Sequence, residues 1–157
     1  MGRKLSLPLH GKALDLLAPP TIDVMRARLG GRATAGGANA VGDVVRIGDE
    51  QPARAGVVLA SDGAAVDVYV DRGTVRRTRA AEVHPWLGEL PDPLSTVARD
   101  ARVFAGLLEG QAVRFATGDG AVEQGTLLEK CRWGGLVQRG DGVVVGIGFR
   151  RVLPAVG

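Results

Sequence analysis

The sequence has few of the side chains from which catalytic and metal sites are built. Its 157 residues include one cysteine, Cys131, and two histidines, His10 and His84. A single cysteine cannot form an intramolecular disulfide, and no metal site of the usual Cys and His spacing is present. Nucleophilic catalysis needs a nucleophile, a base and an orienting group, and the glycine-rich phosphate loops between a strand and a helix are missing too. We therefore expect a protein that is not an enzyme and needs no metal and no cofactor.

Long apolar runs are also missing. No segment approaches the roughly 18 uninterrupted apolar residues of a membrane span, because polar residues and a proline interrupt residues 5–17. Together with the single cysteine, this favours a reducing, cytoplasmic location and no membrane partner. Aromatic residues make up only 4% of the chain, whereas glycine occurs 24 times. The remaining apolar residues are mostly Val, Ala and Leu, which favours short strands joined by tight turns.

The positive charge of the chain is modest, at a formal +3. The sequence pI of about 9.6 mainly reflects the use of arginine, in a composition typical of GC-rich bacterial genomes. Residues 1–40 are the most basic stretch, with six Lys and Arg against two Asp. Within it, Ile22, Met25 and Leu29 recur at helical spacing and predict a short helix over residues 21–29. Residues 30–40 (GGRATAGGANA) are typical of a flexible linker.

The chain contains the same pattern twice, in residues 42–85 and 110–154. With one insertion, glycines and apolar residues coincide in these pairs: Gly42 and Gly110, Val45 and Val113, Arg46 and Arg114, Gly56 and Gly125, Leu59 and Leu128, Val68 and Val137, Gly73 and Gly142, Val75 and Val144, Val83 and Val152, Pro85 and Pro154. Such a repeat indicates a duplicated structural unit. The first copy predicts strands over residues 43–47, 56–60, 65–71, 74–79 and 83–85, with glycine-containing turns.

A helix is predicted between the two copies. Asp92 can cap a helix whose first position is Pro93. Gly110 follows its predicted end, and these apolar residues recur at helical spacing: Leu94, Val97, Ala98, Ala101, Phe104, Ala105 and Leu108. We expect this apolar stripe to be buried against one of the β units.

The two copies resemble the SH3-like barrel superfamily in its KOW or Tudor-like form. Each opens with Gly-x-x-Val-Arg, and a glycine that starts the next strand and three further strands follow. The resemblance implies a mainly β fold with two tandem SH3-like barrels and a partly flexible N-terminal segment. The expected division is a basic segment over residues 1–40, barrels over 41–86 and 110–157, and a connecting helix over 92–109. Such families are binding modules for RNA or DNA backbone, for ribosomal or transcription components, or for peptides.

Outward-facing basic residues are the candidates for phosphate contact. In the second copy, Val143, Val145, Ile147 and Phe149 define the buried face of a strand. The same phase in the first copy turns Arg77 and Arg79 outward and Arg76 inward. Non-enzymatic binding of nucleic acid is the main functional hypothesis, with the basic N-terminal segment and these predicted contacts: Arg77, Arg79, Lys130, Arg132, Arg150 and Arg151. A solvated charged surface explains the same residues equally well.

The rival hypothesis is a protein-interaction or assembly module within a larger particle. Trp133 stands beside Gly134 and Gly135, which leave room for a neighbouring chain, and it is the predicted partner-binding residue. A place in the core is the alternative for Trp133. Reading of methyl-lysine is disfavoured in the first copy, which offers only Tyr69, with Trp86 just beyond its end. The second copy has Phe115, Trp133 and Phe149, which either line a groove or form the core. Homo-oligomerisation stays open.

Overall fold

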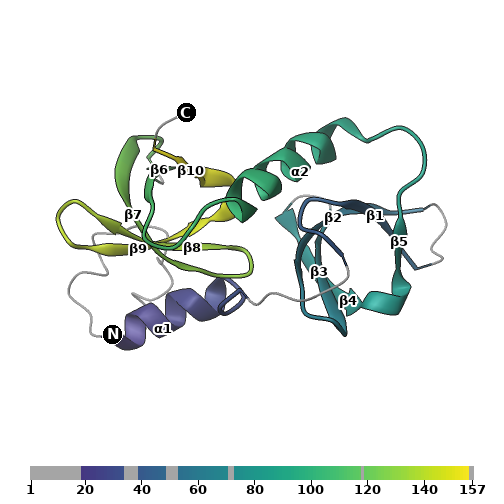
Figure 1. The fold of residues 1–157 in the computed structure, drawn as a ribbon, viewed down its shortest axis with the longest axis horizontal. Helices are drawn as coiled ribbons and strands as arrows, with labels where there is room; N and C mark the ends of the chain where they lie inside the picture. Colours follow the sequence, from purple (N-terminus) through teal and green to yellow (C-terminus); the bar gives the residue numbers. More distant parts are fainter. Residues whose placement is uncertain (1–18, 34–38, 49–52, 71–72, 118, 156–157) are drawn as a thin grey trace. The chain divides into compact units, whose positions relative to one another are not determined.

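The chain forms two compact units. The structure, a computed structural model, describes residues 19–33, 39–48, 53–70, 73–117 and 119–155. One unit comprises residues 34–105 and the other residues 1–33 and 106–157; we name them the β1–β5 unit and the β6–β10 unit after their strands. Each contains one five-stranded antiparallel sheet and one α-helix (Figure 1). The fold is therefore mainly β, as the sequence predicts.

The β1–β5 unit is an antiparallel sheet with a valine-rich core. Its strands are β1 (Val44–Ile47), β2 (Ala55–Ser61), β3 (Ala65–Tyr69), β4 (Val75–Arg79) and β5 (Val83–Pro85), with the 3-10 turn η4 (Ala80–Glu82) before β5. They lie in the order β4-β3-β2-β1-β5. The core consists of Val45, Ile47, Val58, Val66, Val68 and Val70. The predicted strands of the first copy are confirmed to within two residues at each end.

The β6–β10 unit has the same strand order, β10-β6-β7-β8-β9. Its elements are β6 (Ala112–Ala116), β7 (Val122–Lys130), β8 (Gly134–Arg139), β9 (Val144–Gly148), the 3-10 turn η5 (Phe149–Arg151) and β10 (Val152–Pro154). The predicted inward phase of β9 is confirmed, because all four of its marker residues are buried: Val143, Val145, Ile147 and Phe149.

The duplication is visible at matched positions of the two sheets. β2 and β7 each contain a β-bulge, and the bulged residues are Leu59 and Leu128, which the sequence alignment pairs. Gly56 and Gly125, also paired by the alignment, have no room for a Cβ, because it would overlap atoms of the neighbouring strand. The repeated glycines therefore reflect a close approach of strands that both copies share.

Closure of the sheets into barrels is not found. Among the described residues, β4 and β5 are the edges of one sheet and β9 and β10 the edges of the other, and no strand pairing joins the two edges in either unit. In both units a 3-10 turn carries the chain from one edge strand to the other. The coarser prediction of two similar antiparallel β units is thus confirmed, whereas hydrogen-bonded barrel closure is absent from the described strands.

Helix α2 (Asp92–Ala105) packs against β2 in the β1–β5 unit. Its buried side chains are those of the predicted stripe, namely Leu94, Val97, Ala98, Ala101 and Phe104. The prediction was wrong for Ala105, which is exposed, and for Leu108, which is 71% exposed. The helix ends at Ala105, four residues before the predicted end at residue 109.

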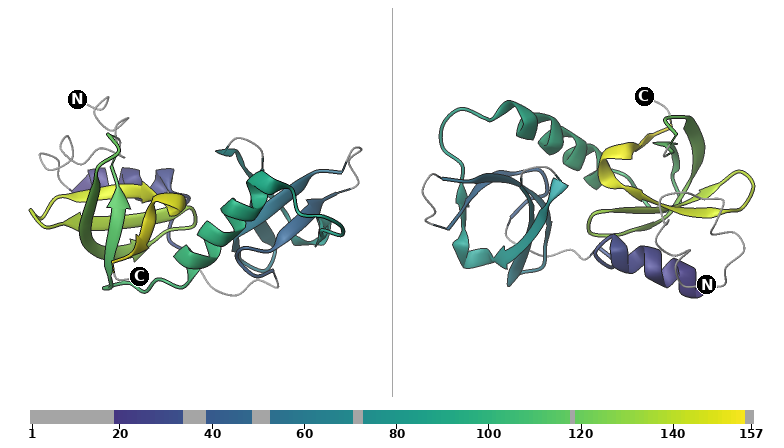
Figure 2. Two further views of the ribbon diagram at one scale, coloured as in Figure 1. Left: turned by 90° about the horizontal axis from the view of Figure 1, so that it is seen from above. Right: turned by 180° about the vertical axis from the view of Figure 1, so that it is seen from behind.

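Helix α1 (Pro19–Arg28) lies on β8 and β9 in the β6–β10 unit (Figure 2). Met25 and Leu29 pack with Cys131 and Leu136. Gly146 of β9 lies beneath them, and a Cβ there would meet Met25 at 3.4 Å and Leu29 at 3.5 Å. The short helix predicted over residues 21–29 is therefore present. Residues 1–18, and residues 34–38 of the predicted linker, lie outside the described part of the chain.

No helix in the described part of the chain has the length and apolar character needed to cross a membrane.

Candidate functional site

The predicted nucleic-acid contacts of the first copy lie on β4, an edge strand of its sheet. The side chains of Arg77 and Arg79 are 54% and 80% exposed. Arg76 is opposite Val68 in the register and so has the predicted inward phase, yet its side chain is exposed as well. β4 therefore presents three exposed guanidinium groups within a single strand.

Carboxylates of the same unit hold two of these arginines. Arg77 donates to both oxygens of Asp67, at 2.7 and 3.2 Å, and Asp67 is fully buried. The hydrogen bonds and charge of this pair raise the pKa of Arg77. Arg79 donates to Glu82 at 3.1 Å. Hydrogen bonds from Thr78 and then Arg79 hold the pKa of Glu82 below its ordinary value.

The four predicted contacts of the second copy differ in exposure, and Arg150 alone among them is exposed. Lys130 donates to a backbone carbonyl before β6 at 2.9 Å, and burial lowers its pKa. Arg132 is buried, with 9% of its surface exposed. Arg151 is half-buried and donates to the carbonyl at the end of β6 at 2.7 Å. Lys130, Arg132 and Arg151 thus contribute to the internal structure of the β6–β10 unit.

Trp133, the predicted partner-binding residue, is half-buried between β7 and β8. Its backbone N–H donates to the carbonyl of Leu29 at 2.9 Å. A Cβ on Gly30 would lie 2.8 Å from the indole ring, and one on Gly134 would lie 2.9 Å from the Leu29 side chain. The space beside the glycines therefore holds the end of α1 from the same chain. Contact of Trp133 with a partner stays a prediction.

A cluster of charges fastens α1 and the residues after it to β7. Glu129 is buried and accepts hydrogen bonds from Arg26 at 2.5 and 3.1 Å, and Arg32 forms an ion pair with it at 2.9 Å. The hydrogen bonds from Arg26 are the main reason why the pKa of Glu129 is lowered. Cys131 lies next to this carboxylate, and burial raises its pKa to about 12. The thiol is therefore protonated at neutral pH, in agreement with a core residue.

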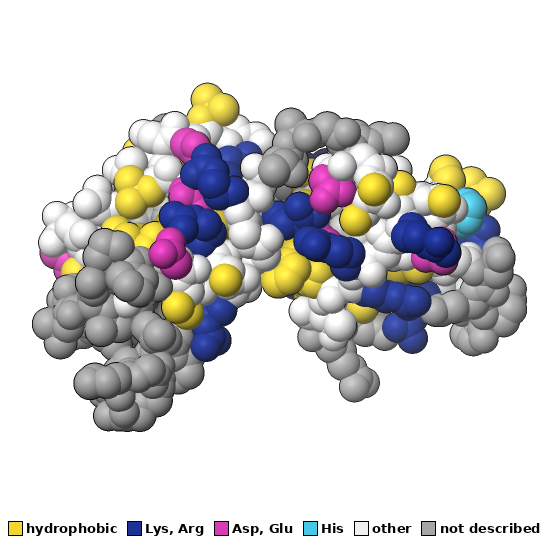
Figure 3. Space-filling model, turned by 90° about the horizontal axis from the view of Figure 1, so that it is seen from below, with side chains coloured by type: hydrophobic (Ala, Val, Ile, Leu, Met, Phe, Trp, Pro, Cys, Tyr) yellow, Lys and Arg dark blue, Asp and Glu magenta, His cyan; other side chains and the backbone are white. Residues whose placement is uncertain are grey.

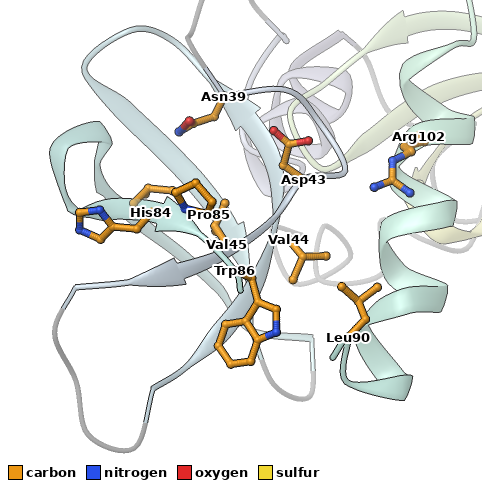
Figure 4. A pocket seen from close by; sticks show the side chains of 10 residues that line it. Asn39, Asp43, Val44, Val45, His84, Pro85, Trp86, Leu90 and Arg102 are labelled. Carbon is orange, nitrogen blue, oxygen red and sulfur yellow. The ribbon is translucent and has the colours of Figure 1, made fainter. Parts of the chain in front are cut away.

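A pocket of about 370 Å³ lies on the outer side of β1 and β5 (Figure 4). Val44, Pro85, Trp86 and Leu90 form its apolar wall. Its polar lining residues include Asp43, His84 and Arg102, and the His84 ring points away from the other two (Figure 4). The sequence pattern did not predict this pocket; its one signal is Trp86, an aromatic residue just beyond the end of the first copy.

The described surface mixes both signs of charge. On the face that Figure 3 shows, acidic side chains lie beside several of the basic ones. No group of three or more His, Cys, Asp and Glu side chains that could hold a metal ion is found among the described residues. No protein-family model matches the sequence, and no curated protein matches it significantly.

Proposed function

We propose that the chain is a non-enzymatic binding module with two SH3-like units, and that it contacts RNA or DNA backbone through Arg76, Arg77 and Arg79 of β4. The observation that carries the proposal is the exposure of three guanidinium groups on one edge strand. Guanidinium groups bind phosphate through both charge and paired hydrogen bonds. The strand order shared by the two units, and the 3-10 turn before each last strand, support the SH3-like assignment.

Comparison of the two copies supports a specific role for these arginines. The alignment of Val75 with Val144 pairs Arg77 with Gly146 and Arg79 with Gly148. In the β6–β10 unit, Gly146 lies under helix α1. The shared fold therefore does not require arginine at these positions, and the first copy has exposed positive charge where the second has glycine.

The Asp67 carboxylate prepares Arg77 for such a contact. Two nitrogens of the guanidinium group donate to Asp67, at 2.7 and 3.2 Å, while the side chain stays 54% exposed. A guanidinium group carries five N–H donors in a planar arrangement, so donors remain for a phosphate. Because the carboxylate fixes the group in place, less rotamer entropy is lost on binding.

The test is a binding measurement by fluorescence anisotropy with a labelled single-stranded RNA and a labelled DNA duplex. Phosphate contacts release condensed counterions, so the affinity should fall steeply as salt rises. The double variant Arg76→Gln, Arg79→Gln should weaken binding to all sequences alike. For single-stranded RNA it should reduce the slope of log K against log salt by about 1.4, since each lost contact contributes about 0.7.

A matched control removes the same charge elsewhere in the unit. Arg54 and Arg99 are exposed and lie outside β4, so Arg54→Gln, Arg99→Gln should change the slope much less. Absence of binding to either nucleic acid at low salt, or equal losses in the two double variants, would overturn the proposal.

A further inference from the structure

The two units carry their helices on the outer face of the sheet but over different strands, and among the described helices of the β6–β10 unit none packs over β6 and the part of β7 up to Leu128. In the β1–β5 unit, α2 packs against β2, and the bulged Leu59 is 6% exposed. In the β6–β10 unit, α1 packs on β8 and β9 instead. The bulged Leu128 of β7, which the alignment pairs with Leu59, is 41% exposed. The same position is thus buried in one copy and accessible in the other.

The register of the strands shows which residues lie on the outer face of β6 and β7. Val113 and Phe115 of β6 point into the core, so the residues that alternate with them, and their partners on β7 and β10, point outward. This face, which we name the Leu128 face, consists of Ala112, Arg114, Ala116, Val122, Gln124, Thr126, Leu128 and Leu153. Its large apolar members are well exposed, with Val122 at 67% and Leu153 at 38%.

The dimensions of the Leu128 face suit a helix of the length of α2. Val122 and Leu128 are six residues apart on one strand, which corresponds to about 20 Å. Helix α2 has 14 residues, and such a helix is about 21 Å long. A helix of this size can therefore cover the face from one end to the other.

The end of the Leu128 face also has a place for a basic side chain. In the β1–β5 unit, Arg102 of α2 donates to the Gly42 carbonyl at 2.9 Å, and a Cβ on Gly42 would overlap the Arg102 side chain. Gly110 is the matching glycine of the second copy, and nothing lies within 4 Å of the position of its Cβ. The neighbouring carboxylate of Glu109 accepts a hydrogen bond from the Lys130 backbone N–H at 2.8 Å and pairs with Arg32 at 3.4 Å. Its side chain is still 41% exposed, so its negative charge can also attract a cation from a partner.

We propose that the Leu128 face docks an amphipathic helix of a protein partner, with an aliphatic stripe over β6 and β7 and an arginine or lysine at Gly110 and Glu109. The helix would be seated as α2 is seated on β2 in the other copy. Helix-in-groove recognition of this kind depends on apolar anchors at i, i+3, i+4 and i+7, which is the pattern that α2 itself presents to β2. This interaction is independent of the nucleic-acid contact proposed for β4.

The probe for the test is a labelled synthetic peptide of residues 91–106, PDPLSTVARDARVFAG, with a side-chain staple on its polar face to hold the helix. The full chain is titrated against it and anisotropy is measured. We expect saturable binding that Leu128→Asp weakens at least tenfold. Leu87→Asp, which alters an 86% exposed residue of the β1–β5 unit, should have no effect. Replacement of the peptide residue that corresponds to Arg102 by alanine should weaken binding severalfold.

Several outcomes would overturn the proposal. The Leu128 face does not bind a helix if no binding is detected up to millimolar peptide. The same conclusion follows if Leu128→Asp and the unaltered chain bind the peptide equally. Self-association that Leu128→Asp abolishes, measured by sedimentation, would assign the face to a second copy of the chain instead. If Leu128→Asp lowers the melting temperature, Val122→Asp is the substitute, since it alters a more exposed residue at the other end of the face.

Discussion

The packing of α1 on the sheet can be tested by placing in β9 the residue that β4 has at the aligned position, where Arg77 pairs with Gly146. Gly146→Arg places a long side chain where a Cβ already meets Met25 at 3.4 Å and Leu29 at 3.5 Å. The arginine and the docked helix cannot occupy this space together. We therefore expect α1 to leave the sheet, or the sheet to distort beneath it.

The magnitude follows from the side chains that α1 buries. Met25 and Leu29 are only 1% and 7% exposed, and full burial of each side chain of this type stabilises a protein by about 1.5–3 kcal/mol. Loss of both contacts gives a decrease of about 3–6 kcal/mol in the free energy of unfolding. This is an upper estimate, because the unfolded chain already buries part of the same surface.

Urea denaturation measures this change, and amide hydrogen exchange of residues 19–28 reports whether α1 is still docked. Gly148→Arg is the matched control on the same strand and face, since nothing lies within 4 Å of a Cβ there; it should change stability by less than about 1 kcal/mol. Gly146→Ala should also be tolerated, because its contacts are at ordinary van der Waals distance. Equal stability of the two arginine variants, with α1 amides still protected, would refute the reasoning.

Three further predictions concern buried groups and the repeated glycines. The pKa of Glu129 is lowered in the folded state, so its contribution is present above the carboxyl's ordinary pKa and is lost as pH falls below about 4; Glu129→Gln should flatten the acid limb of a stability-versus-pH curve. Cys131 should resist iodoacetamide at pH 8 and react only when the chain unfolds, as followed by mass spectrometry, because burial raises its pKa to about 12. Gly56→Ala and Gly125→Ala should each lower the melting temperature, since the added Cβ overlaps the neighbouring strand in both units.

The strands were predictable because the repeat restricts them twice. The positions of Gly56 and Gly125 are fixed by the close approach of strands in each copy, and the paired leucines Leu59 and Leu128 are the bulged residues in both. Helix α2 was equally predictable from the sequence, since its buried stripe follows a period of 3.6 residues. These features arise from local geometry, which produces a regular pattern in the sequence.

The partial burial of Lys130 and the burial of Arg132 were not predictable in the same way. After the bulge at Leu128 the simple alternation of faces is interrupted. The residues that follow the bulge contact the segment after α1, which lies about 100 residues earlier in the sequence. The backbone N–H of Arg132, for example, donates to the Gly31 carbonyl at 2.9 Å. No counterpart of this contact is found among the described residues of the first copy, so neither periodicity nor the repeat could indicate it.

The different placement of the two helices explains why the copies diverged in surface chemistry. A β unit of about 45 residues buries too little surface to be stable alone, so each copy is completed by a helix. Once α2 covers β2 in one unit, Leu59 must remain apolar and buried, while β4 is free to acquire Arg77 and Arg79. Once α1 covers β9 in the other, Gly146 must remain small, and Leu128 is no longer needed for the core. Leu128, which is 41% exposed at that position, is therefore accessible to a partner, and the docked helix proposed above would bury it as α2 buries Leu59.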